Sequence, residues 1–173
     1  MQSCRAVRCF GVSASAILRK STGAQKGPGV IRKLPSRREI DELIAFLPRL
    51  TADGFSPVRE WSGGEKQADG AYVMPWPVYD KVVKELFEAA GQDCWMDFDY
   101  VPEEAGRMLE DRALVRQASL DQVKTMLTYC VRGERFCDGH WGAMIEQGHV
   151  RRLLERLAQL RATAIRCATD KER

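Results

Sequence analysis

The first regular pattern of apolar and polar positions begins at Ser36. Residues 36–39, Ser-Arg-Arg-Glu, form a capping box, in which the serine hydroxyl and the glutamate carboxylate each satisfy a free backbone N–H. Apolar residues then recur with helical spacing at Ile40, Leu43, Ile44 and Leu47. The pattern predicts a helix that Pro48 disturbs in its last turn and that ends by residues 53–54, Asp-Gly.

Residues 55–77 lack a helical period. Apolar residues at Phe55, Val58 and Trp61 precede polar Gly-containing turns at 62–64 and 69–70, and the run 71–74 follows them. This order predicts a small antiparallel β-ribbon. Pro75 and Pro77 exclude an interior strand, so we expect an edge ribbon lying on the helices.

Helical spacing returns after the ribbon. It predicts helices over 78–90, from Pro102 to about Asp111, from a second capping box at Ser119, over 140–147, and from His149 to about Ile165. The intervening piece 94–100 is read as a short strand or an extended loop. The predicted fold class is therefore mainly α (α+β), with about five or six helices and a short antiparallel β-ribbon.

The formal net charge of +3 hides two oppositely charged parts of the 173-residue chain. Residues 1–38 hold nine basic and no acidic residues, which leaves residues 39–173 with 18 basic and 24 acidic residues, a net charge of −6. We therefore expect a disordered basic extension over 1–34, a single mainly helical domain over 35–166 and a flexible tail over 167–173. Targeting is an alternative role for the extension.

Charge and hydropathy also limit the partners. The acidic domain lacks the dense positive surface that neutralises phosphates, so nucleic acid is expected only through the basic extension, if at all. No apolar run approaches the roughly 20 residues of a membrane span, so no membrane partner is expected. The six cysteines are interpreted as reduced thiols that mostly occupy the core.

The segment 129–157 carries a recognisable motif. Its pieces are Arg-Gly-Glu-Arg-Phe-Cys-Asp-Gly at 132–139 and Gly148 before a leucine-rich helix, and Gly-Gly-Glu at 63–65, Asp-Gly at 69–70 and Met-Pro at 74–75 accompany it. Over roughly residues 36–160 the chain resembles a family of small bacterial proteins of unknown function. The resemblance implies a bacterial, cytoplasmic protein, and it implies no activity, cofactor or catalytic residue.

Reactive residue types are concentrated in segment 130–149. Cys137 and His140 are three residues apart, with Cys130 upstream and His149 downstream, but zinc sites prefer two short ligand pairs. We therefore expect no metal and no cofactor. Cys137 as a nucleophile with His140 as its base is the candidate catalytic pair, although such partners usually come from distant parts of a sequence.

An anion site and a structural turn are the other interpretations of this segment. Arg132, Arg135 and His140 could hold an anion near the start of the helix that follows Gly139. The structural interpretation is favoured: Glu134 and Arg135 would satisfy backbone groups at the helix ends, while Phe136 would anchor the turn in the core.

The function that we favour from the sequence is a non-enzymatic protein-interaction module. Its candidate contact surfaces are the aromatic middle region and the turn 132–139, and another protein is the expected partner, with the oligomeric state left open. The alternative is a small enzyme or ligand-binding protein with an anion-binding pocket around Arg132, Arg135 and His140. A concave pocket holding those side chains would favour the alternative, and a flat exposed aromatic patch would favour the module.

Overall fold

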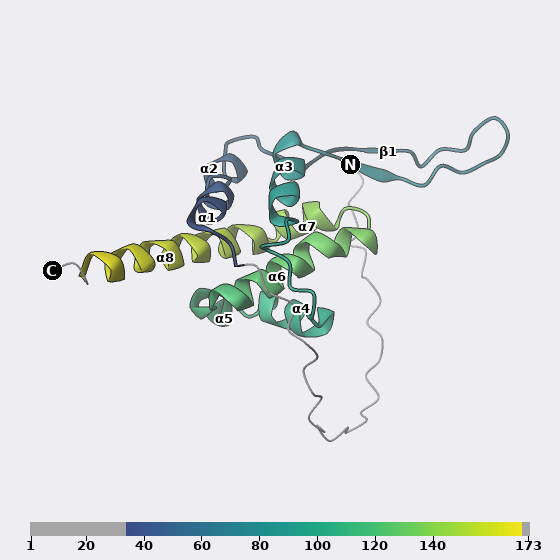
Figure 1. Ribbon diagram of the computed structural model, residues 1–173. Coiled ribbons are helices and arrows are strands. Elements are labelled where there is room, and N and C mark those ends of the chain that lie inside the picture. Colours follow the sequence, from purple (N-terminus) through teal and green to yellow (C-terminus); the bar gives the residue numbers. More distant parts are fainter. Residues whose placement is uncertain (1–33, 171–173) are drawn as a thin grey trace, which may run out of the picture. The chain divides into compact units, whose positions relative to one another are not determined.

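The computed structural model of the chain describes residues 34–170, and the side chains of residues 34–164 (Figure 1). The predicted basic extension lies outside this range apart from Leu34. The elements, in chain order, are α1 (Arg37–Ile44), α2 (Leu47–Leu50), β1 (Val58–Ser62), β2 (Trp76–Tyr79), α3 (Lys81–Ala90), α4 (Pro102–Glu110), α5 (Arg112–Gln117), α6 (Leu120–Arg132), the 3-10 turn η1 (Gly133–Arg135), α7 (His140–Glu146) and α8 (His149–Asp170). The predicted fold class, mainly α with a short antiparallel ribbon, is confirmed.

Both predicted capping boxes are present. The Glu39 amide donates to the Ser36 hydroxyl at 3.3 Å, and the Glu39 carboxylate accepts from the Ser36 amide at 2.6 Å. Ser119 and Gln122 make the same reciprocal pair at the start of α6. Each box satisfies N–H groups that a helix start leaves without intrahelical partners.

Several elements differ from the sequence-based expectation. Helix α5 was not predicted, because its six residues are too few to show a helical period. Asp111 caps it by accepting from the amides of Ala113 and Leu114. Of the two alternatives for segment 94–100, the loop is observed and the strand is not, while α8 extends beyond its predicted end to Asp170. Within the described residues, none of the helices has the length and apolar content that crossing a bilayer requires.

The core is built around α6 and α8. Helix α8 packs against α1, α5, α6 and α7, while α4 packs on α6. Leucines of α8 at 153, 154 and 157 are fully buried, and Trp95, from the loop after α3, is 1% exposed in the same cluster. Full burial of such side chains contributes roughly 1.5–3 kcal/mol each to stability.

The two strands form a hairpin that extends away from the helices (Figure 1). Strand β1 pairs antiparallel with β2, Trp61 opposite Pro77 and Ser62 opposite Trp76. Backbone hydrogen bonds continue to a tip at 67–71, where Gly70 has a φ of 85°. We call residues 58–79 the arm. The prediction that the ribbon lies on the helices is correct only for its base, because the hairpin's own hydrogen bonds support the rest.

Candidate functional site

The turn between α6 and α7 is organised around the carboxylate of Glu134. The backbone amides of Gly139 and Trp141 donate to it at 3.1 and 2.9 Å, and the Tyr79 hydroxyl lies 2.7 Å from both of its oxygens. The two amides belong to the start of α7, where N–H groups lack intrahelical acceptors and a negative charge is favourable. The prediction that Glu134 satisfies backbone groups is confirmed.

Tyr79 joins the arm to this turn. Burial raises the pKa of its hydroxyl well above its usual range, and the hydrogen bond and negative charge of Glu134 raise it further. The hydroxyl therefore remains protonated and donates to the carboxylate. This bond connects residues that are 55 positions apart in the chain.

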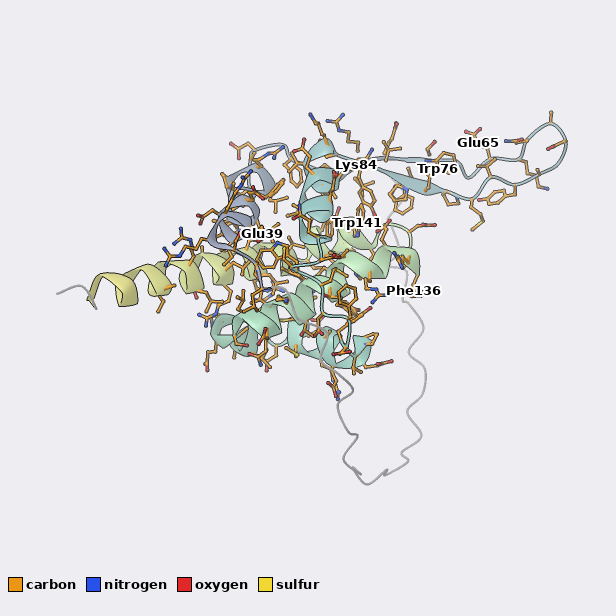
Figure 2. The ribbon with its side chains drawn as sticks, viewed as in Figure 1. Glu39, Glu65, Trp76, Lys84, Phe136 and Trp141 are labelled. Carbon is orange, nitrogen blue, oxygen red and sulfur yellow. The ribbon has the colours of Figure 1, made fainter. Side chains whose placement is uncertain are left out.

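The prediction that Phe136 anchors the turn is wrong. Its side chain is 84% exposed (Figure 2). Trp141 is the anchor instead: its ring stacks on Phe87 at 4.6 Å, lies 5.5 Å from the Tyr79 ring, and its indole N–H donates to the Val131 carbonyl at 3.0 Å. An irregular turn has no helical period, so the sequence does not determine which of its aromatic side chains points inward.

The residues of the predicted anion pocket have different surroundings. Arg135 is exposed and makes no hydrogen bond or ion pair with the described residues, so the prediction that it satisfies helix-end groups is wrong. The Arg132 guanidinium lies over the Tyr100 ring, 5.5 Å from its centroid. His140 is partly buried against α6. An anion pocket around these three residues stays a prediction.

His140 is held by packing on two residues of the preceding elements. Its ring lies against Gly133, where any Cβ would overlap it, and it meets the Tyr129 ring edge-on at 5.5 Å. Its Nε2 is buried without a hydrogen-bond partner among the described residues. Packing and a hydrogen bond with the Tyr129 backbone hold the ring in place, and its role as a base for the partly buried Cys137 stays a prediction.

The two other described cysteines lie in the core. Cys94 and Cys130 are about 1% and 0% exposed, which confirms the prediction for these two residues. Burial raises the pKa of the Cys130 thiol to about 12, so this residue is a poor nucleophile at neutral pH. Among the described side chains, no three His, Cys, Asp or Glu residues are grouped as metal ligands would be.

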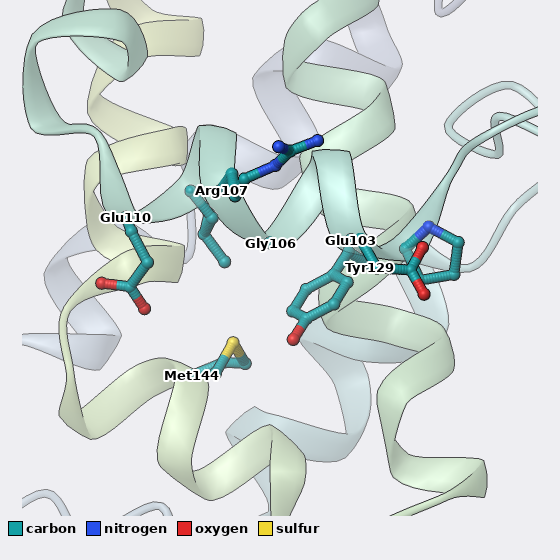
Figure 3. A pocket seen from close by; sticks show the side chains of 8 residues that line it. Glu103, Gly106, Arg107, Glu110, Tyr129 and Met144 are labelled. Carbon is teal, nitrogen blue, oxygen red and sulfur yellow. The ribbon is translucent and has the colours of Figure 1, made fainter. Parts of the chain in front are cut away.

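A pocket of about 430 Å³ lies between α4, α6 and α7 (Figure 3). Tyr129 and Met144 line it from α6 and α7, and Glu103, Arg107 and Glu110 line it from α4. The mixed charges of these α4 residues give the pocket no marked preference for anions or cations. The sequence analysis did not predict this pocket, because its residues are far apart in the chain.

His149, at the start of α8, lies close to Glu110, one of the residues that line this pocket. It is 3% exposed; its Nδ1 lies 2.7 Å from the Arg152 guanidinium, and its Nε2 lies 3.0 Å from the Gln147 amide oxygen and 3.5 Å from Glu110. Since guanidinium only donates, Nδ1 is the acceptor and the neutral ring carries its proton on Nε2. Burial lowers the pKa of His149, and Arg152 lowers it further.

The two histidines predict a loss of stability on acidification. Burial also lowers the pKa of His140, so near and below pH 6.5 the unfolded chain binds protons that the folded chain does not. The free energy of unfolding should therefore be highest above this range and fall between about pH 7.5 and 5.5, where ordinary carboxylates stay charged. Urea midpoints across this range should show the slope, and the His140→Gln/His149→Gln variant should flatten it. An unchanged slope in the variant would refute this assignment.

The arm carries half of the large exposed apolar side chains in the described part of the chain. They are Trp61, Tyr72, Met74 and Trp76, between 47% and 70% exposed. Trp61 and Trp76 occupy neighbouring positions in the ladder and therefore point to opposite faces. Trp61 touches the backbone at Gly139, which has a φ of 88° and no room for a side chain, whereas Trp76 packs on Gly63 within the arm.

Comparison with known protein families gives a match to a family of unknown function. A family model described as a family of unknown function, DUF6508, matches residues 35–163. Neither a curated protein nor a solved structure matches the chain. The resemblance to a family of unknown function is thereby confirmed, and it assigns no activity to the turn, the pocket or the arm.

Proposed function

We propose that this chain, which belongs to the DUF6508 family of unknown function, is a non-enzymatic protein-interaction module that uses its arm as the contact surface. The observation that carries the proposal is the exposure of four large apolar side chains on one projecting hairpin (Figure 2). Single exposed apolar residues are ordinary, but a cluster on one element is typical of interaction sites. The resemblance to small bacterial proteins supports a bacterial cytoplasmic setting, which stays a prediction.

None of these four side chains belongs to the core cluster. Met74 is 70% exposed and Tyr72 is 55% exposed, and both lie in the part of the arm beyond the paired strands. Only the base of the arm, through Val58 and Tyr79, packs with the hydrophobic core. Aromatic residues and methionine are enriched where proteins bind one another, so the tip and middle of the arm have the composition of a contact surface.

The backbone of the arm offers a binding mode. Pro77 in β2 has no N–H and excludes an interior position for that strand, so among the described residues the outer edge of β1 is the edge that a further strand can pair with. An extended segment of a partner can add to such an edge, with its backbone hydrogen-bonded and its side chains packed on neighbouring aromatics. We therefore propose an extended segment of another protein as the occupant.

The alternative with an anion pocket around Arg132, Arg135 and His140 receives less support. Arg132 lies over Tyr100, Arg135 is exposed, and His140 packs against Gly133. The pocket between α4, α6 and α7 and a groove between α5 and α8 are lined by other residues. An exposed aromatic surface is the feature that separates the module from this alternative.

The proposal predicts that Trp76→Ser removes peptide binding and leaves the fold intact. Peptides would be selected from a displayed random library on the full chain, and their affinities measured against the parent and the variant. We expect about a tenfold or larger loss of affinity, because a tryptophan at the centre of a contact commonly contributes 2 kcal/mol or more. The urea midpoint should change little, since Trp76 is 47% exposed and does not belong to the core cluster.

Phe98→Ser is the matched control. Phe98 is 64% exposed and lies in the loop before α4, so the variant loses an aromatic side chain outside the arm. Peptides that bind the parent and both variants equally would contradict the proposal. Self-association of the parent that Trp76→Ser abolishes, with no peptide selected, would identify a second copy as the occupant instead and overturn the proposed partner.

A further inference from the structure

Helices α5 and α8 enclose a groove of about 240 Å³ that carries four arginines. Arg112 and Arg116 come from α5, Arg152 and Arg156 come from α8, and Glu155 and Gln159 also line the groove. Members of each pair are four residues apart, which places them on one face of their helix. The arm leaves the helices at the end of the molecule away from α5 (Figure 1), so the groove is separate from the contact surface proposed above.

The two arginines of α8 are held in place by neutral acceptors. Arg152 donates to the Gln147 carbonyl at 3.1 Å and lies 2.7 Å from the His149 Nδ1, while the Arg156 Nε donates to the Ala118 carbonyl at 2.8 Å. These partners fix the guanidinium groups without neutralising their charge. In the described part of the chain, the Arg152 Nε is buried and has no acceptor.

The groove has an excess of positive charge. Glu155 is its one acidic lining residue, and its carboxylate pairs at 2.8 Å with Arg151, which does not line the groove. Arg112 and Arg116 are exposed and form no ion pair or side-chain hydrogen bond with described residues. A concave surface with charge of one sign concentrates its field, so counter-ions accumulate there. The charge contrasts with the net −6 of residues 39–173.

We propose that this groove binds the phosphate groups of a small polyvalent anion, as free pyrophosphate or as the polyphosphate chain of a nucleotide. The planar guanidinium group matches two oxygens of a phosphate, and two pre-positioned arginines opposite two exposed, unpaired ones among the described residues can surround a ligand with several charges. The volume equals that of about eight liquid waters, which suits a short polyphosphate and not a nucleic-acid duplex.

The test is isothermal titration of the full chain with inorganic pyrophosphate and, separately, with ATP. We expect pyrophosphate to bind to the parent. Arg112→Gln/Arg116→Gln should weaken this binding about tenfold or more, because charge-assisted hydrogen bonds to phosphate contribute more to affinity than neutral ones. Both positions are exposed, so the urea midpoint of the double variant should stay close to that of the parent. Binding of ATP but not pyrophosphate, with the same loss in the variant, would support the groove and assign the phosphate to a nucleotide.

Arg132→Gln/Arg135→Gln is the control, because it removes an equal number of positive charges at another place and tests the anion site predicted from the sequence. We expect its affinity for pyrophosphate to equal that of the parent. No binding of either probe to the parent would overturn the proposal. An equal loss of pyrophosphate affinity in both double variants would show a non-specific charge effect and would overturn the proposal. A loss of affinity confined to the control would place the site at Arg132 and Arg135 and would also overturn it.

Discussion

Replacing Trp141 by alanine is expected to lower the free energy of unfolding by about 3 kcal/mol or more. The ring stacks on Phe87 with an interplanar angle of 3° and also contacts Tyr79, so its removal leaves a cavity between α3, the arm and α7. The indole N–H donates to the Val131 carbonyl, which also loses its partner. Such a loss is a large part of the stability of a typical domain.

Phe136→Ala is the control for this prediction. The side chain is 84% exposed, so its removal should change the free energy of unfolding by no more than about 0.5 kcal/mol. Urea denaturation of both variants, followed by far-UV circular dichroism, gives the comparison. A large loss of unfolding free energy in Phe136→Ala, together with a small loss in Trp141→Ala, would contradict this arrangement of the turn.

The contrast between these two aromatics shows where sequence reasoning succeeds and where it stops. The capping boxes at Ser36 and Ser119 were predicted correctly because a capping box lies within four consecutive residues. Trp141 and Phe136 have similar chemical character, and only contacts with Phe87 and Tyr79, more than 50 positions earlier, decide which one packs against the core. That information is not local.

The same limit applies to the two surfaces proposed for binding. The repeat of arginines at four-residue spacing is visible in the sequence, but α5 is too short to be predicted, so its position beside α8 could not be inferred. The arm was predicted as a ribbon from its turns and prolines. Its extension beyond the helices depends on backbone hydrogen bonds between residues at 64–73, and the sequence does not show whether a helix covers these residues.

Replacing Glu134 by alanine is the second substitution that is expected to lower the free energy of unfolding strongly. Glu134→Ala removes the acceptor of the Tyr79 hydroxyl and of the amides of Gly139 and Trp141. We expect it to lower the free energy of unfolding by about 2–3 kcal/mol. The neighbouring Arg135→Ala should cost no more than about 0.5 kcal/mol, because Arg135 is exposed and contacts no charged partner among the described residues. Urea midpoints of the two variants measure the difference. Equal midpoints would show that the carboxylate does not hold the turn.

A double-mutant cycle with Tyr79→Phe separates the link to the arm from the capping of α7. Tyr79→Phe removes only the hydroxyl, whereas Glu134→Ala also removes the acceptor of two amides, so Glu134→Ala should be the more costly change. Because the hydroxyl donates to an ionised carboxylate at 2.7 Å, we expect the two substitutions to be coupled by about 1 kcal/mol or more. Additive effects would mean that the arm and the turn are stabilised independently, and that the bond between Tyr79 and Glu134 does not fix the base of the arm.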